Sequence, residues 1–371
     1  MVKKEEQTEE RVFGMNLKRI EIKNFRGLYS FACDSFGDIT IICGRNNCGK
    51  TTLLEAIDFL YFSTVGGTAL SLNVARHIQP LGWDELRTLF SDMDEGRKVE
   101  IKAEFLNDGE KTVEAQIVKS RTTPLSDDGR ADMRLGRILV VKSVSPGGES
   151  SREARLFWSK AGPRVPGALA TDGWVSENAD VEALQRQWAV FLPSSVRADT
   201  CIQPLKELID RKDQGDIVNV LRRIDHRIVD ITIVGEEIKA NVDGVAQLLP
   251  VRVLGDGMMK ILCVLVAIKV CEDNGCVLID EIDNGLHFSA YTQLMLAAAE
   301  FASQRNVQLV ISTHSHEFLS RLATDDALQS LLGAEGKFRF LNMISSRSRT
   351  DLIEYDYDQF RTAMNNGLEV R

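Results

Sequence analysis

One short segment combines glycines, a lysine and a threonine at the spacing that binds nucleotide phosphates. Residues 44–51 read GRNNCGKT, which fits G-x-x-x-x-G-K-[ST] in full, between an apolar strand-like run and a predicted helix over 52–62. Glycines let backbone N–H groups converge on phosphate oxygens at the positive end of the following helix. Lys50 is expected to reach the β- and γ-phosphates, and the Thr51 hydroxyl to bind Mg²⁺. The predicted nucleotide ligands are Gly44, Arg45, Asn46, Asn47, Cys48, Gly49, Lys50, Thr51 and Thr52. The alternative, a chance match in a glycine-rich turn, does not account for the strand–loop–helix context.

Two adjacent carboxylates end an apolar run far downstream, where residues 276–281 read CVLIDE. Consecutive side chains of a strand point to opposite faces, so Asp280 and Glu281 are expected to have different roles. Asp280 is predicted to hold Mg²⁺ together with Thr51, and Glu281 to orient and polarise the attacking water. The alternative is a solvated strand end that carries two acids. The acidic pair favours hydrolysis over passive nucleotide binding, and its distance from the phosphate loop indicates a large insertion in the nucleotide fold.

Two further segments are candidates for contact with phosphate. His314 ends the apolar run 310–314, where a neutral imidazole can sense the γ-phosphate; the alternative is a structural histidine. The LGDG segment, residues 254–257, precedes a predicted helix over 258–271, and its N–H groups can bind an anion; the alternative is a helix-capping turn. The candidate ligands in it are Gly255, Asp256 and Gly257. His314 and His316 are too few to indicate a zinc site.

Composition limits the class of protein. The chain has 371 residues, of which 44% are hydrophobic and 27% charged, as expected for two or three globular domains. A net charge of −9 argues against a surface that coats nucleic acid, so any DNA contact is local or supplied by a partner. Seven cysteines without a C-x-x-C pair favour a reducing compartment. No signal peptide or membrane-spanning run is found, so we expect a cytoplasmic protein that does not bind membranes.

The predicted elements place these segments in an α/β protein with a buried parallel sheet, because continuous apolar strands alternate with helices in the C-terminal third. A strand over 17–25 opens the chain, and alternation over 99–105 and 113–117 predicts a β-hairpin. Loops and a mobile insertion are expected over 120–180, around two strands at 137–142 and 154–158. The next expected elements are helices over 181–191, 203–211 and 215–226 and a strand pair over 228–242. The last are strands over 276–280, 307–312, 338–344 and 351–355, with helices over 288–304, from 316 and over 357–365.

Six motifs occur in an order that resembles the ABC-type ATPases of the OLD (overcoming lysogenization defect) family, which are related to SMC and RecF-like ATPases. They are FRG (25–27), GRNNCGKT (44–51), FLPS (191–194), LGDG (254–257), LIDEIDNGLH (278–287) and STHS (312–315). The resemblance implies a P-loop NTPase fold of the ABC/SMC-like type. It has a mixed sheet, an antiparallel β-subdomain and an inserted helical and β lobe. The implied divisions are a charged arm over 1–14, ATPase parts over 15–119 and 251–371, and a lobe over 120–250.

The resemblance also implies ATP and Mg²⁺ as cofactors and a head-to-tail homodimer, or a higher homo-oligomer, with ATP sandwiched between subunits. The phosphate loop of one subunit would then face LGDG of the other, with Asp283, Asn284 and Gly285 at the contact. His314 matches the family's switch histidine.

The sequence departs from the family pattern at three places. The usual signature serine is absent near LGDG, where Arg252, Val253 and Leu254 stand. Gln79 and Gln116 are both candidates for the glutamine near the metal. The stretch after His314 is too short for the TOPRIM nuclease domain of many relatives, and 356–358 (DYD) is expected to be a solvated face.

We therefore expect a stand-alone ATPase that senses or regulates a separately encoded effector, such as a TOPRIM or HNH nuclease or a toxin, in antiphage defence of the PARIS type. One alternative is a RecF- or SMC-like ATPase that repairs or clamps DNA. Another is an ATP-bound scaffold with little turnover. A transporter ATPase subunit fits the motifs less well. The 120–180 insertion is the expected place of partner specificity.

Overall fold

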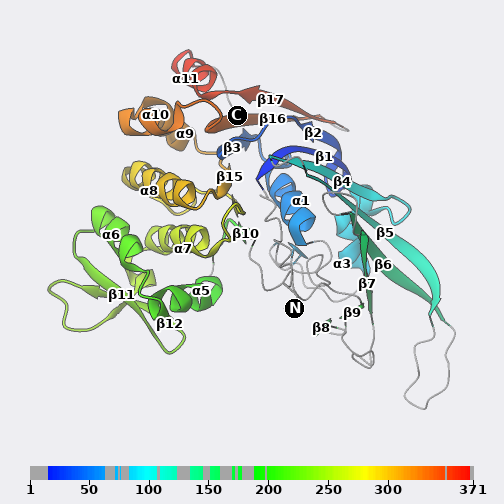
Figure 1. The fold of residues 1–371 in the computed structure, drawn as a ribbon, viewed down its shortest axis with the longest axis horizontal. Coiled ribbons are helices and arrows are strands. Elements are labelled where there is room, and N and C mark those ends of the chain that lie inside the picture. Colours follow the sequence, from blue (N-terminus) through cyan, green and yellow to red (C-terminus); the bar gives the residue numbers. More distant parts are fainter. Residues whose placement is uncertain are drawn as a thin grey trace, which may run out of the picture.

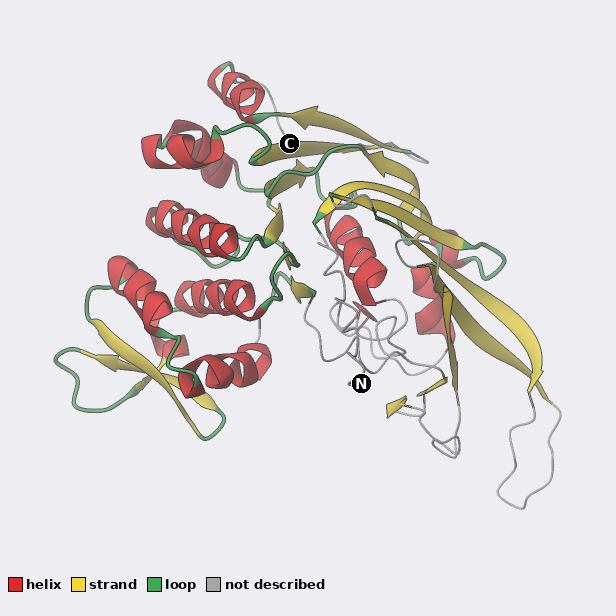
Figure 2. Ribbon diagram, in the orientation of Figure 1, coloured by secondary structure: helices red, strands yellow, loops and turns green. Residues whose placement is uncertain are grey.

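The computed structural model describes residues 16–62, 72–73, 76, 83–106, 109–122, 134–144, 151–158, 169–171, 174–177, 188–196, 199–346 and 349–367. The predicted arm over 1–14 lies outside these residues. In the described part, three sheets and the helices between and beside them enclose two hydrophobic cores (Figures 1 and 2).

A six-stranded sheet at the centre carries the phosphate loop, and its strand order is β10-β14-β15-β3-β16-β17. All neighbours are parallel except the antiparallel pair β16 and β17. Both faces of its inner strands are buried, which explains their continuous apolar runs: Ile41 faces one core and Ile42 the other. The strands are β3 (Ile39–Gly44), β10 (Ala189–Leu192), β14 (Cys276–Ile279), β15 (Gln308–Ser312), β16 (Phe338–Ser345) and β17 (Thr350–Tyr355).

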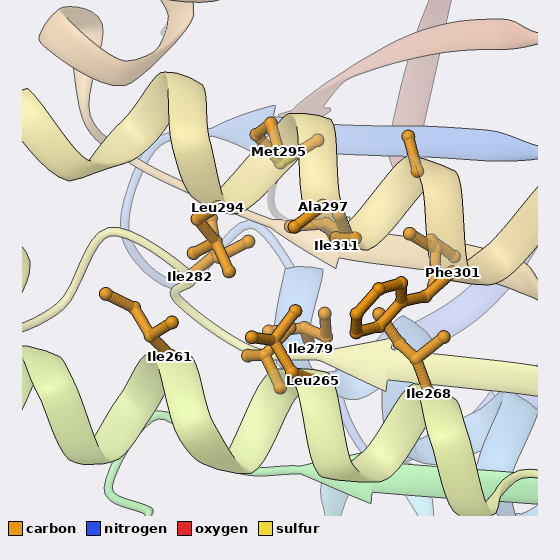
Figure 3. Packing of buried hydrophobic residues seen from close by; sticks show 14 of the residues in the cluster. Ile261, Leu265, Ile268, Ile279, Ile282, Leu294, Met295, Ala297, Phe301 and Ile311 are labelled. Carbon is orange, nitrogen blue, oxygen red and sulfur yellow. The ribbon is translucent and has the colours of Figure 1, made fainter. Parts of the chain in front are cut away.

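Helices cover the two faces of this sheet differently. One face carries the helices α7 (Asp256–Val270), α8 (Tyr291–Gln304), α9 (His316–Thr324), α10 (Asp326–Leu332) and α11 (Tyr357–Asn365). In Figure 3, Ile261 and Leu265 of α7 and Leu294 and Phe301 of α8 pack over Ile279. On the other face, α1 (Lys50–Phe62) lies between the central sheet and a second sheet (Figure 1).

The second sheet is antiparallel throughout, in the order β2-β1-β4-β5-β6-β7-β9-β8. The predicted hairpin is confirmed, because β4 (Val99–Phe105) pairs with β5 (Glu110–Thr122). The two strands predicted over 137–142 and 154–158 are confirmed as parts of β6 and β7, which are longer than expected. Residues 120–122, predicted as loop, continue β5, which pairs with β6 along its length. The remaining strands are β1 (Leu17–Phe25), β2 (Leu28–Cys33), β6 (Arg134–Val144), β7 (Ser151–Trp158), β8 (Leu169–Thr171) and β9 (Trp174–Glu177).

A small lobe joins the start of α7. It contains α5 (Asp199–Asp210), α6 (Gly215–Ile224), β11 (Ile228–Val234), β12 (Glu237–Val242) and β13 (Leu249–Pro250). These elements confirm the helices and strand pair expected over 203–242. The short helices outside the lobe and the main layers are α3 (Trp83–Leu86) and the 3₁₀ turns Arg87–Leu89, Ser91–Met93, Val251–Leu254 and Phe288–Ala290. The fold class is confirmed, whereas the domain boundaries stay predictions.

The helix predicted over 181–191 is wrong at its end. Residues 189–192 form β10, whose residue Val190 pairs with Val277 of β14, and residues 181–187 lie outside the described part. The apolar run AVFL suits a buried strand as well as a helix, and pairing with a strand distant in sequence decides between them.

A buried glutamine holds the two large sheets together. The side chain of Gln308 on β15 accepts a hydrogen bond from the Leu17 N–H (2.8 Å) and donates to the carbonyls of Leu17 and Gly37 (2.9 Å each). The seven cysteines are buried, and none of them forms a disulfide bond. Among the described residues, no helix is long and apolar enough to cross a membrane.

Candidate nucleotide-binding and hydrolysis site

The phosphate loop has the backbone that its glycines were expected to allow. It connects β3 to α1, and Gly44 and Gly49 have φ angles of 144° and 105°. A Cβ atom on Gly44 would lie 2.4 Å from the Met343 carbonyl oxygen, so only glycine fits there. The side chains of Arg45, Asn46 and Asn47 are exposed, and Cys48 is buried. The loop thus presents its backbone at the N-terminus of α1, where an anion binds favourably.

The lysine of the loop folds back over it. The Lys50 ammonium donates hydrogen bonds to the carbonyls of Gly44 (2.9 Å) and Arg45 (3.1 Å) and is 8% exposed. This position places a positive charge over the loop, where phosphate oxygens are expected.

A hydroxyl and a carboxylate that are 229 residues apart in the chain meet beside the loop. The Thr51 hydroxyl lies 3.1 and 3.0 Å from the two carboxylate oxygens of Asp280, which follows β14. The Ser312 hydroxyl, at the end of β15, donates to Asp280 Oδ1 (2.5 Å). Hard oxygen ligands of this kind, few in number and beside a phosphate site, suit Mg²⁺. The structure therefore brings together the two predicted metal ligands.

Glu281 occupies a different environment from Asp280, as predicted, although the reason differs. β14 ends at Ile279, and Glu281 has a φ of 46°, so strand alternation does not set its direction. This left-handed conformation is uncommon outside glycine and occurs often at functional sites. The Glu281 N–H donates to the Ser312 hydroxyl (2.8 Å), and its side chain is 35% exposed. The buried Asp280 can hold a cation, while Glu281 is open to water.

His314 lies beside two acids. Its Nδ1 is 3.9 Å from Glu281 Oε1 and 3.9 Å from Asp283 Oδ2, and its side chain is 51% exposed. The Thr313 hydroxyl donates to Asp283 (2.5 Å) and fixes that carboxylate. His314 is thus an exposed residue at the carboxyl edge of the sheet rather than a buried structural histidine.

The LGDG segment leads into α7, as predicted, but the helix begins at Asp256, two residues earlier than expected, with Gly255 as N-cap at a φ of 114°. It lies against the loop that follows Glu281: a Cβ on Gly257 would be 2.7 Å from the Gly285 carbonyl oxygen. Gly255 and Asp256 are exposed. Among the described residues, no hydrogen bond joins LGDG to the phosphate loop of the same chain. The contact of LGDG with a nucleotide bound to a second subunit stays a prediction.

Sequence reasoning missed a cluster of charged side chains around Glu55 of α1. Glu55 has no exposed surface, and its carboxylate contacts Arg26 (3.2 Å) and Arg76 (2.6 Å). The Arg26 guanidinium also donates to Asn73 (3.1 Å), and burial lowers its pKa to about 10. Arg76 in addition reaches the hydroxyl of Thr52 (3.3 Å). The signal was present as an acidic residue within an apolar helix and as the arginine of the FRG motif.

A second missed residue is Lys260 on α7, whose ammonium donates to the main-chain carbonyl of Asp280 (3.0 Å). Burial lowers the pKa of Lys260 to about 8. A single lysine inside the apolar segment 258–268 was the available signal.

The remaining sequence candidates are two glutamines and the DYD segment over 356–358. Gln116 is exposed on β5, opposite Val140, and Gln79 lies outside the described residues. Asp356 is the N-cap of α11 in a capping box with Gln359, which agrees with a solvated helix border rather than a metal site.

Comparisons with known proteins agree with this geometry. Residues 39–320 match the family described as "AAA domain, putative AbiEii toxin, Type IV TA system". An ATP/GTP phosphatase of Helicobacter pylori is 25% identical over 331 residues, which cover 82% of this chain and 87% of that protein. The DNA replication and repair protein RecF of Psychromonas ingrahamii is 29% identical over 154 residues, which cover 39% of this chain and 38% of RecF.

Solved structures show the same fold. An SMC head bound to the C-terminal winged-helix domain of ScpA has a TM-score of 0.50 at 13% identity, covering 94% of this chain and 99% of that one. The SMC head of Pyrococcus furiosus with an extended coiled coil also has a TM-score of 0.50, at 11% identity, covering 95% and 99%. The molecule therefore has an SMC-head-like P-loop NTPase fold.

Proposed function

This chain belongs to the AAA-domain family that its residues 39–320 match, and on that premise we propose that it binds ATP with Mg²⁺ and hydrolyses it to ADP and phosphate. The observation that supports the proposal is the contact between Thr51 and Asp280 beside the phosphate loop, because a hydroxyl and a carboxylate at this place would suit Mg²⁺. The similarity to an ATP/GTP phosphatase supports hydrolysis.

Each residue of the site has a separate task in this proposal. The loop N–H groups and Lys50 bind the β- and γ-phosphates, while Thr51 and Asp280 hold Mg²⁺, which supplies positive charge to the phosphate oxygens. Glu281 accepts a proton from the water that attacks the γ-phosphate, and the bond to the ADP oxygen breaks. His314, close to Glu281, contacts the γ-phosphate region and responds to its presence.

The test is Glu281→Gln, which removes the proton acceptor and keeps the side-chain shape. The wild type should release phosphate, and the variant should bind ATP with similar affinity while turnover falls at least 100-fold. Glu317→Gln, an exposed glutamate in the first turn of α9, is the matched control and should leave turnover unchanged. Equal turnover in the wild type and Glu281→Gln would instead favour the ATP-bound scaffold.

We further propose that ATP assembles two copies head to tail, in the manner of the OLD family, and that this assembly controls a separately encoded effector in antiphage defence. The exposure of Gly255 and Asp256 beside the loop of Asn284 and Gly285 supports an ATP sandwich, since these residues are open to a second subunit. The family description names a "putative AbiEii toxin" of a toxin–antitoxin system, which supports the proposal that the protein acts in a system with a toxic component.

Mass determination of the protein co-expressed with its neighbouring genes tests this proposal. ATP should double the mass of Glu281→Gln, and a second protein should co-elute. A monomer at all ATP concentrations would contradict the sandwich.

The partial similarity to RecF favours one second candidate, an ATPase that clamps DNA. It predicts ATP-dependent binding of duplex DNA that weakens steeply with salt. A lone dimer with this behaviour would replace the effector proposal.

A further inference from the structure

We propose that Lys260 is a positioning residue for hydrolysis, because its ammonium group ties the helix that starts in LGDG to the peptide group between Asp280 and Glu281. This inference deepens the proposed ATPase function and rests on it.

Lys260 joins three parts of the site through main-chain acceptors. It lies one turn after Asp256 on α7, is 4% exposed, and its Nζ is 3.0 Å from the Asp280 carbonyl oxygen. The same atom is 3.4 Å from the carbonyl oxygens of Pro193 and Ser194, just beyond the end of β10. An ammonium has three donors, and three carbonyls surround this one.

Packing alone does not require a lysine at this place. The neighbouring residues of α7 pack through apolar side chains such as Ile261 and Leu265, which lie against Ile279 and Ile282 in Figure 3. Burial of an ammonium costs free energy unless its hydrogen bonds are made, so an apolar residue would serve simple packing better. The directional bonds of Lys260 therefore point to a task in alignment.

The peptide group that Lys260 holds is the one that sets the direction of Glu281. Its carbonyl belongs to Asp280 and accepts from Lys260, and its N–H belongs to Glu281 and donates to the Ser312 hydroxyl (2.8 Å). Glu281 has a φ of 46°, a conformation that persists when the surroundings fix it from several sides. Lys260 and Ser312 thus hydrogen-bond to the carbonyl and to the N–H of the same peptide group.

The same contact connects this peptide to the signature segment. Ser194, which receives Lys260, also accepts a hydrogen bond from the Asn284 side chain (3.4 Å), in the loop that lies against Gly257. A phosphate bound at the start of α7 would therefore act on the direction of Glu281 through Lys260, which links engagement of the signature segment to turnover.

The experiment compares Lys260→Met with the wild type and with Lys269→Met, a lysine of the same helix whose ammonium pairs with Asp213 and Asp216. In Lys260→Met, kcat should fall at least tenfold while the KM for ATP changes less than threefold. Lys260→Arg should restore part of kcat, and Lys269→Met should stay within twofold of the wild type. In a Glu281→Gln background, Lys260→Met should lower turnover no further, because Lys260 acts through Glu281.

Unchanged kcat in Lys260→Met overturns the inference, and so does a further loss in the Glu281→Gln background. If Lys260→Met does not fold, Lys260→Gln, which keeps two donors, is measured by the same criteria. A wild type that turns over no faster than Glu281→Gln refutes the proposed function instead, so the two failures are distinguishable.

Discussion

Removal of one buried hydroxyl should weaken hydrolysis without removing any group that touches the nucleotide. Ser312 is fully buried, and its hydroxyl donates to Asp280 (2.5 Å) and accepts from the Glu281 N–H (2.8 Å). Ser312→Ala removes both hydrogen bonds at once, leaves a buried N–H without that acceptor and frees the Asp280 carboxylate to turn.

The expected loss of kcat/KM in Ser312→Ala follows from the negative charge of Asp280, to which the Ser312 hydroxyl donates. A hydrogen bond to a charged group contributes roughly 1.5–3 kcal/mol. If this free energy is lost from the transition state, kcat/KM falls about 10- to 150-fold, since about 1.4 kcal/mol corresponds to a factor of ten.

Steady-state phosphate release, measured over a range of ATP and Mg²⁺ concentrations, gives the comparison. Ser330→Ala, which removes an exposed hydroxyl bonded to the Asp326 carbonyl, is the control and should leave kcat/KM unchanged. A Ser312→Ala enzyme within threefold of the wild type would refute the reasoning that Ser312 orients the two acids.

Three further predictions concern other parts of the molecule. Glu55→Gln should lower the free energy of unfolding by about 3–5 kcal/mol, because it leaves the buried Arg26 and the more exposed Arg76 without their carboxylate; urea unfolding measures this, and a loss below about 1 kcal/mol would contradict it. Burial raises the pKa of Asp58 to about 7, so the ionised form is disfavoured in the fold and the wild type should lose stability as pH rises from about 4 to about 7. Asp58→Asn should therefore gain stability over that window, by up to roughly 4 kcal/mol at pH 8, whereas a gain independent of pH would argue against this origin. Gly257→Ala should lower kcat about tenfold, which corresponds to about 1.4 kcal/mol, because its Cβ would lie 2.7 Å from the Gly285 carbonyl oxygen. Gly215→Ala, whose Cβ meets open space, should leave kcat unchanged. Equal kcat values for Gly257→Ala and the wild type would count against the contact.

The parts of the site that sequence could predict are those that one short segment determines. The glycines, Lys50 and Thr51 lie within eight residues, and Asp280 and Glu281 directly follow one apolar strand, so residue type and spacing sufficed to select them. Thr51 and Asp280 meet because β3 and β14 are parallel strands of one sheet, and the carboxyl ends of parallel strands share one edge.

The parts that sequence could not predict depend on partners distant in the chain. β10 was predicted as helix because its residues suit either state, and its pairing with β14 decided the outcome. Lys260 bonds to main-chain carbonyls of distant segments, and Ser312 bonds to the Asp280 carboxylate and the Glu281 N–H, so the spacing of residue types does not reveal their partners. The sequence predicts that Glu281 and Asp280 point in different directions because side chains alternate along a strand. In the structure, the left-handed φ of Glu281 sets its direction instead.

The side chain of Gln308 has a consequence for the synthesis of the protein. It bonds to Leu17, which lies 291 residues earlier in the chain, and β3 has β15 and β16 as its two neighbours. At roughly 5–20 residues per second, a ribosome needs about 15–60 seconds to cover that separation. During this time the strand that carries the phosphate loop has neither neighbour. A ribosome-bound chain that ends before Gln308 is therefore expected to retain no ATP, because the strand that carries the phosphate loop cannot pair before β15 has been made.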